Sequence, residues 1–374
     1  MNSFVNYLFT FAAIQGFIIA ISLLFKKDGK RANKFLSLMV TFLSLDLLSL
    51  NYYLSGFYLQ FPWFAELNYP FTFLYGPLFY FYISYETGHK ERFRLRDYLH
   101  FIPVAVIYMF MSPLLFMNAG ERIDNLHKMS YNPPLWLVVL SYLRSWIGFV
   151  YSIMTIRLLI RWDYEIREVA SNTDQINLIW FKRLAIGFML IWVIVLTSTT
   201  AMFAGLIAGN QVDFYIYPFV ALIIYLIGYM GLIQPQIFLK PLNAEEPDTA
   251  KYEKSGLDDS AANEILKNLD TLMTGEKLYL NPDLSLSELA DTLNTSTHRL
   301  SEAINSRINK NFYDYVNEMR IEHFKREIKK PGSEVYNILS IALDSGFNSK
   351  ATFNRVFRKY TGMTPSEFVR SEQT

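Results

Sequence analysis

Two different patterns of hydrophobic and polar residues divide the chain. Residues 1–239 carry long apolar runs, and the first of them, Phe4–Phe25, contains no charged residue. About 20 apolar residues in a helix are enough to cross the hydrocarbon core of a bilayer. The pattern therefore predicts seven membrane-spanning helices, at Phe4–Phe25, Phe35–Leu54, Tyr69–Tyr85, Phe101–Met117, Leu135–Ile160, Leu184–Ala208 and Phe214–Ile233.

Basic residues are distributed unevenly among the loops between these segments. One set of alternate loops contains 13 Lys and Arg, whereas the other set, counted with the N-terminus, contains only Arg122 and Lys128. Because basic loops remain on the cytoplasmic side of a membrane, we expect the N-terminus to lie outside. Seven spans then place the residues after Ile233 in the cytoplasm. The sequence therefore predicts a multi-pass protein of the bacterial cytoplasmic (inner) membrane.

Two ionisable residues fall inside the expected spans, Asp46 in the second and Arg144 in the fifth. A charge at this depth is costly and usually faces the bundle interior, a water-filled cavity or a partner charge. One hypothesis is an intramembrane polar pair between Asp46 and Arg144. The alternative is that each is a separate packing residue or lies nearer the membrane interface.

The pattern changes after the last apolar run. Residues 240–260 are polar and acidic without apolar periodicity, which is typical of a flexible linker. From Ala261 onward, apolar residues recur at helical spacing. We therefore expect an all-α protein with three parts: a transmembrane domain of seven helices (1–239), a cytoplasmic linker (240–260) and a C-terminal helical domain (261–374).

Two short helices around a tight turn are expected near the C-terminus. Gly346 suits the left-handed backbone that ends a helix, and Ser349 is a good residue to cap the next one. In that second helix, Phe353, Val356, Phe357 and Tyr360 share one face and leave basic and amide side chains on the other. A short helix with such an outer face fits the major groove of DNA, where Arg, Lys and Asn reach base edges and phosphates.

The run IALDSGFNSKATFNRVFRKYTGMTPSEFVR, residues 341–370, resembles the second helix-turn-helix of AraC-type (AraC/XylS) transcription regulators. It contains A-x-x-S-G-F, F-x-R-x-F-R-K and G-x-T-P-S-E-F in order, and N-E-M-R-I-E at residues 317–322 is similar to the family's connecting helix. The resemblance covers Leu278–Arg370, about a quarter of the chain. It implies two helix-turn-helix units, joined by the helix expected at Phe312–Lys330, that enter successive major grooves about 34 Å apart.

The resemblance also implies which residues face DNA. In the first unit they are His298, Ser301 and Glu302, and in the second Lys350, Ala351, Asn354 and Arg355. Glu302 departs from the family, which commonly has a basic residue there. A carboxylate can accept a hydrogen bond from cytosine but repels phosphate, so the base contacts of the first unit are less secure.

Composition excludes several kinds of chemistry. The chain has no cysteine, so disulfides and thiolate metal sites are excluded, and its five histidines are scattered without ligand spacing. Since no catalytic motif is found either, we expect neither an enzyme nor a cofactor or metal. Residues 277–374 contain 14 Lys and Arg against 12 Asp and Glu, so one copy should bind DNA weakly and a homodimer is expected.

The sequence thus favours a one-component transcription regulator embedded in the membrane and controlled by a signal that its spanning domain senses. The partners it implies are double-stranded DNA, the lipid bilayer, an effector that the sequence does not identify, a second copy of the chain and RNA polymerase. Two alternatives stay open. One is a membrane transporter or sensor whose helical tail binds proteins, and the other is a DNA-binding domain that the membrane part only tethers.

Overall fold

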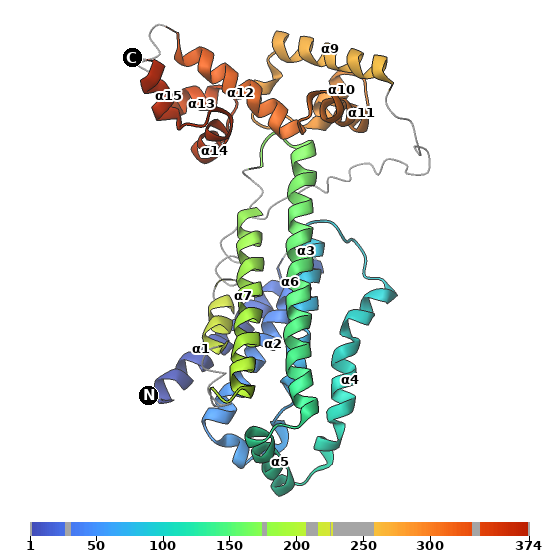
Figure 1. Cartoon of the computed structure of the whole chain (residues 1–374), viewed down its shortest axis with the longest axis vertical. Coiled ribbons are helices and arrows are strands. Elements are labelled where there is room, and N and C mark those ends of the chain that lie inside the picture. Colours follow the sequence, from blue (N-terminus) through green and yellow to red (C-terminus); the bar gives the residue numbers. More distant parts are fainter. Residues whose placement is uncertain are drawn as a thin grey trace. The chain divides into compact units, whose positions relative to one another are not determined.

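The computed structural model is built from helices and describes residues 2–26, 31–173, 178–206, 216–224, 226, 258–330 and 337–372 (Figure 1). It divides into two compact units. Unit 1 comprises Met1–Ile160 and Leu178–Gln236, and unit 2 comprises Arg161–Asn177 and Ile237–Thr374. Unit 2 thus includes a segment, Arg161–Asn177, that we expected within the transmembrane domain. Most of the expected linker, up to residue 257, lies outside the described residues.

Unit 1 combines long helices with short 3₁₀ turns. The turns are Phe57–Leu59, Pro62–Phe64, Tyr69–Phe73, Leu95–Phe101 and Ser112–Phe116. The α-helices are α1 (Asn2–Leu24), α2 (Arg31–Leu54), α3 (Tyr75–Glu86), α4 (Ile102–Met111), α5 (Ala119–Tyr131), α6 (Leu135–Val169) and α7 (Leu178–Phe203), and residues 216–224 are also helical.

Five stretches among the described residues are long and apolar enough to cross a membrane: Asn6–Leu24, Arg31–Leu54, Leu95–Leu114, Leu135–Val169 and Trp180–Phe203. They coincide with five of the seven expected spans. The span expected at Tyr69–Tyr85 is instead a 3₁₀ turn followed by the 12-residue helix α3. Half of the span expected at Phe214–Ile233 lies outside the described residues, and residues 216–224 within it are helical.

The short helix α3 forms part of the buried core of unit 1. Its residues Leu78, Phe81 and Ile83 have no exposed surface. Pro70, which cannot donate a backbone hydrogen bond, lies in the 3₁₀ turn before α3, whereas Pro77 lies in the first turn of the helix, where a proline is tolerated. A helix running through the whole stretch would leave the Phe73 carbonyl without a donor at Pro77, so this apolar run does not form one long helix.

Helix α6 is longer than a bilayer requires. Its 35 residues correspond to about 52 Å, whereas the hydrocarbon core is about 30 Å thick. Its last residues are charged and pair along the helix: Arg161 Nε lies 2.7 Å from the Glu165 carboxylate, and Arg167 Nε lies 3.5 Å from that of Asp163. These ion pairs stabilise the part of the helix that follows its apolar residues. This part, residues 161–169, belongs to unit 2.

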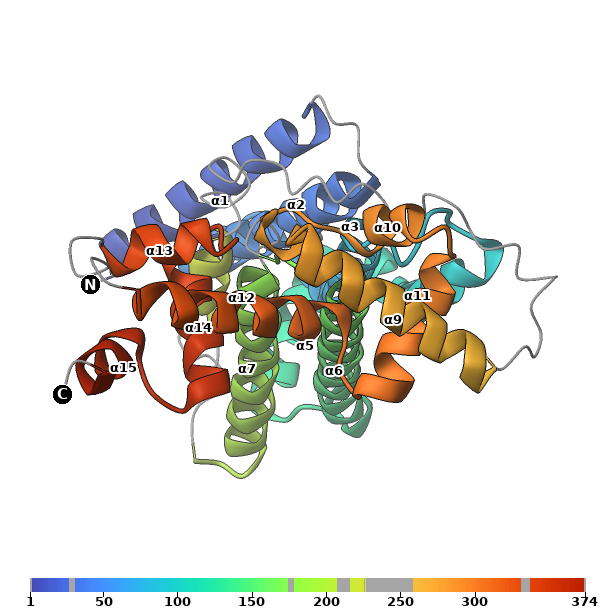
Figure 2. The same ribbon diagram turned by 90° about the horizontal axis from the view of Figure 1, so that it is seen from above.

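Unit 2 contains two helix pairs that share one central helix. Figure 2 shows α12 passing between α9–α11 on one side and α13–α15 on the other. Phe312 and Val316 of α12 pack into a first hydrophobic cluster, and Ile321 and Phe324 into a second. The helices are α9 (Asp259–Gly275), α10 (Leu286–Thr292), α11 (Thr297–Ala303), α12 (Phe312–Ile328), α13 (Ile338–Asp344), α14 (Lys350–Thr361) and α15 (Pro365–Glu372), with a 3₁₀ turn at Leu278–Leu280 and a π turn at Ile304–Ile308.

Gly346 fills the tight turn between α13 and α14 as the sequence predicts. Its φ is +92°, and a Cβ atom placed on it would lie 2.5 Å from the carbonyl oxygen of Tyr279. We expect Gly346→Ala to destabilise unit 2 by about 2 kcal/mol, measured by chemical unfolding, because left-handed strain adds to the clash. Gly362→Ala is the matched control, since its φ is +77° but nothing lies within 4 Å, and it should cost about 1 kcal/mol. Equal losses would contradict a role for the close approach.

Candidate nucleic-acid interface

The first helix-turn-helix unit consists of α10 and α11. Each helix begins at a serine whose hydroxyl accepts a backbone N–H: Ser285 from Glu288 and Ser296 from Arg299, both at 3.2 Å. His298 is exposed on α11, and its Nδ1 lies 3.8 Å from the Glu302 carboxylate one turn away.

The second unit consists of α13 and α14. Ser349 caps α14 by accepting the Thr352 N–H at 3.2 Å, and Phe353, Val356 and Phe357 are buried, as their spacing predicts. The opposite face of α14 is exposed and carries the residues implied to face DNA, together with one more arginine. These residues are Lys350, Ala351, Asn354, Arg355 and Arg358.

A groove of about 700 Å³ runs beside this exposed face. Lys350, Arg355 and Arg358 line it, and so does Asn337, whose side chain caps α13 by accepting the Leu339 N–H at 3.0 Å. Three cations around one groove favour an anionic ligand such as a phosphate backbone.

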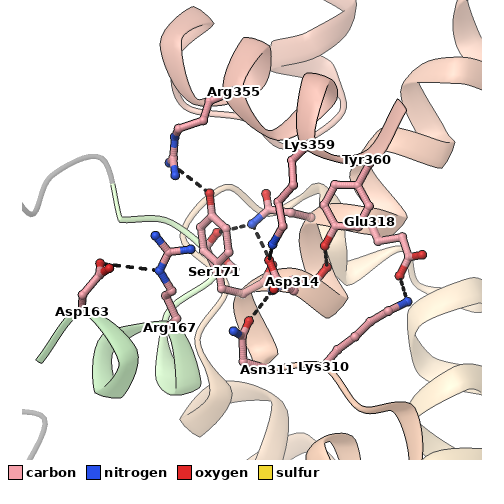
Figure 3. Close-up of polar contacts among 12 residues, drawn as sticks. Asp163, Arg167, Ser171, Lys310, Asn311, Asp314, Glu318, Arg355, Lys359 and Tyr360 are labelled. Atoms are coloured by element: carbon pink, nitrogen blue, oxygen red, sulfur yellow. Dashed lines mark hydrogen bonds and ion pairs between the residues drawn. The ribbon is translucent and has the colours of Figure 1, made fainter. Parts of the chain in front are cut away.

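Hydrogen bonds to α12 fix the orientation of α14. Figure 3 shows Lys359 and Tyr360 reaching Asp314, at the start of α12. Lys359 Nζ lies 2.6 Å from the Asp314 carboxylate, and the Tyr360 hydroxyl donates to the Asp314 carbonyl at 2.8 Å. Arg355 donates to the Tyr313 hydroxyl at 3.2 Å. These contacts hold the exposed face of α14 in a defined position relative to α12.

Comparisons with known proteins identify this part of the chain. Residues 289–371 match a family model described as a helix-turn-helix domain. An uncharacterized HTH-type transcriptional regulator of Staphylococcus aureus (strain COL) is 31% identical over 122 residues, which are 33% of this chain and 15% of the relative. The uncharacterized transcriptional regulatory protein YesN of Bacillus subtilis (strain 168) is 35% identical over 94 residues, a quarter of either chain. The C-terminal part of the chain is an AraC-type helix-turn-helix domain.

The similarity stops at this AraC-type domain. The chain spans about 15% of the length of the Staphylococcus relatives that it matches. No solved structure matches the chain. The apolar helices of unit 1 therefore lie outside the compared regions, and their role is argued below from their own residues.

The end of α6 is built into the core of the AraC-type domain. Ser171, just after this helix, is 1% exposed, and its hydroxyl donates to the Leu284 carbonyl at 2.5 Å. The Arg320 guanidinium, also 1% exposed, donates to the carbonyl of Ser171 at 3.2 Å and to those of Tyr279 and Asn281 at 2.7 and 2.8 Å. Burial lowers the pKa of Arg320 to about 10, so it stays protonated at neutral pH. The buried Arg320 side chain thus links α12 both to the segment after α6 and to residues 279–281.

Two side chains of α6 also contact the parts of the domain implied to meet DNA. Glu168 accepts hydrogen bonds from Ser301 at 3.1 Å and from Asn305 at 2.9 Å. The Arg167 guanidinium lies 5.2 Å from the ring of Tyr313, whose hydroxyl receives Arg355. In Figure 3, Arg167 is also paired with Asp163 of its own helix. The end of α6 therefore touches α11 directly and reaches Arg355 of α14 through one tyrosine.

Our sequence analysis did not find these α6 residues. Glu168 and Arg167 lie in the charged stretch RWDYEIREV, residues 161–169, which follows the span expected at Leu135–Ile160 and which we assigned to a basic loop. The available signal was the i,i+4 charge pairing, which indicates a helix continuing into water. Arg358 was recognised as outward-facing but was not assigned to the DNA-facing set, although it lines the groove with Lys350.

The two ionisable residues of the expected spans line one cavity of unit 1. Asp46 is 5% exposed and accepts hydrogen bonds from the Tyr75 hydroxyl and, at 2.9 Å, from the Asn68 amide. The Arg144 guanidinium lies 5.6 Å from the ring of Tyr69. Among the described residues there is no group of three or more His, Asp or Glu side chains arranged to hold a metal ion.

Proposed function

We propose that the protein is a membrane-embedded transcription regulator that binds specific DNA through its AraC-type domain. The observation that carries this proposal is the pair of capped recognition helices, α11 and α14, held on the shared helix α12. Such a pair can enter two successive major grooves on one face of a duplex. His298, Ser301 and Glu302 would face the first groove, and Lys350, Ala351, Asn354 and Arg355 the second.

The apolar helices support a location in the bacterial inner membrane. The outward surface of α1 is apolar along its length, with Phe11, Ile14, Ile18 and Ile21 each more than half exposed. Such a surface is costly in water and suits lipid. Five long apolar helices are available to anchor the protein, and the C-terminus would lie in the cytoplasm, since the basic loops favour it. The small positive charge of the DNA-binding part supports action as a homodimer, with RNA polymerase as a further partner.

Control by a signal would act through α6. The docked α6 places the Glu168 carboxylate on Ser301 and Asn305, where it occupies their donors and repels phosphate. The docked arrangement would therefore be the form that binds DNA weakly, and a signal sensed by unit 1 would release it. A domain that is merely tethered needs no such contact, and a transporter with a protein-binding tail needs no DNA-facing cations.

We expect Glu168→Ala to raise the affinity of the full-length protein for its DNA site by about 3- to 10-fold. The Ser301 hydroxyl and the Asn305 amide would then be free to donate hydrogen bonds to DNA. The measurement is fluorescence anisotropy with labelled duplex and protein in lipid nanodiscs. Glu165→Ala is the matched control, since it removes the same charge from an exposed ion pair on the same helix and should leave the affinity unchanged. Unchanged or weaker binding by Glu168→Ala would contradict the inhibitory role.

The proposed function has two parts, insertion of the chain into the membrane and specific binding of DNA, and each part has its own test. Full-length protein in nanodiscs should select one duplex from a random pool, and a reporter fused after Thr374 should be active on the cytoplasmic side. A reporter active only outside the membrane, or a pool that shows no enrichment, would reject the proposal in favour of a protein-binding tail.

A further inference from the structure

A cavity of about 110 Å³ lies among the helices of unit 1. It is lined by side chains of α2, α3, α6, α7 and the helical residues 216–223, and most of them are apolar or aromatic. Phe188, Trp192 and Tyr217 supply aromatic walls, whereas Asp46 and Arg144 are the charged lining residues. A cavity of this size approaches the roughly 150 Å³ that holds a benzene molecule in an apolar core.

The polar side chains that line the cavity differ in whether their hydrogen-bonding atoms have partners. Both carboxylate oxygens of Asp46 already accept, one from Asn68 and the other from Tyr75. Two donors are left over: Trp192 Nε1, in a side chain that is 4% exposed, and Arg144 Nε have no hydrogen-bond partner among the described residues. A buried donor without a partner costs free energy that an incoming acceptor recovers. The cavity therefore lacks an acceptor.

Charge and size restrict the guest further. One cationic and one acidic side chain line the cavity, so a charged guest would leave an unbalanced charge away from water. Apart from the hydroxyls of Thr72, Tyr75 and Tyr217, the rest of the lining is apolar, which favours a compact ligand with few polar groups. We propose that this cavity binds a small uncharged molecule with an aromatic or alicyclic body and one hydrogen-bond acceptor, such as an aryl ketone.

The effect that a ligand in this cavity would have on DNA binding rests on the proposed function. Arg144 is part of α6, the same helix that carries Glu168. The two residues are 24 positions apart in the sequence. A guest that engages Arg144 thus acts on the helix whose other end contacts Ser301 and Asn305. A guest can shift this equilibrium only by binding one form of the protein more tightly.

The test compares acetophenone with ethylbenzene, which has the same shape without the carbonyl, and with benzoate, which adds a charge. Binding to full-length protein in nanodiscs is measured by equilibrium dialysis, with empty nanodiscs as the baseline. Acetophenone should bind about 3- to 10-fold more tightly than ethylbenzene, and benzoate more weakly than acetophenone. Equal affinities for acetophenone and ethylbenzene would overturn the proposal and indicate an apolar void.

Two variants locate the site. Trp192→Phe keeps a ring but removes the donor, so acetophenone affinity should fall toward that of ethylbenzene, which should hardly change. Trp146→Phe, at an exposed tryptophan of α6, is the matched control and should retain the preference. Val195→Phe should fill the cavity and weaken both ligands. An undiminished preference in folded Trp192→Phe protein would place the acceptor elsewhere and refute the assignment.

The same preparations are assayed for DNA binding, which separates the two proposals. Acetophenone binding with the expected preference, accompanied by a change in DNA affinity, supports both the site and its link to α6. Specific DNA binding without any acetophenone preference refutes the site and leaves the proposed function standing. An acetophenone preference without specific DNA binding supports the site and refutes the proposed function.

Discussion

Arg320→Met should destabilise unit 2 by about 3 to 5 kcal/mol, the largest effect we expect of a single substitution. The guanidinium donates to carbonyls of Tyr279, Asn281 and Ser171, and to the Ser171 hydroxyl at 3.1 Å. Methionine fills a similar volume but leaves these buried acceptors unsatisfied, and each costs about 1 to 3 kcal/mol. The loss should also free the segment after α6 from the domain.

Hydrogen exchange resolved by mass spectrometry measures both effects in the full-length protein. Amides at residues 278–284 and 169–173 should lose protection together, because the same side chain holds both segments. Arg326→Met is the matched control, since it makes the same substitution at an exposed position of α12. Loss of protection at 278–284 with 169–173 unaffected would contradict the role of Arg320 in joining α6 to the domain.

Arg355→Ala should weaken specific DNA binding by about 1 to 3 kcal/mol, roughly 5- to 150-fold. Arg355 is exposed on α14 between Lys350 and Arg358, and Tyr313 holds its guanidinium at 3.2 Å. An arginine positioned in this way can donate to guanine in the major groove. Its removal should also relax the sequence preference at one base pair, which a binding series over single-base variants of the site would reveal.

Charge alone must be separated from base recognition in that experiment. Lys267→Ala removes one positive charge from the exposed surface of α9, outside both helix-turn-helix units, and should weaken binding equally for all sequences and only slightly. If Arg355→Ala behaves in the same uniform manner, Arg355 contacts phosphate and not a base.

The AraC-type domain was predictable because its signals are local. Ser349 and Gly346 specify where α14 begins and α13 ends, and the spacing of Phe353, Val356 and Phe357 specifies the buried face. The placement of Arg355 against Tyr313 was not predictable, since it depends on how α14 packs on α12, 42 residues earlier.

The apolar helices of unit 1 were predictable where a stretch is simply long and uncharged, as in α1 and in α7 after Arg183. They were less so at Tyr69–Tyr85, where the apolar count favours a span but Pro77 restricts the helix to the shorter α3. The unexpected membership of Arg161–Asn177 in unit 2 has another cause. Hydropathy reports where a helix leaves lipid, but not where the helix ends or what its polar end contacts.

The central claim is that two recognition helices on one chain read successive grooves of DNA while the chain is embedded in a membrane. Hydroxyl-radical footprinting of a selected duplex, with full-length protein in nanodiscs, tests it most directly. The account predicts two protected stretches on one face of the duplex, separated by about one helical turn. Protection confined to a single groove, or no protection at saturating protein, would contradict it.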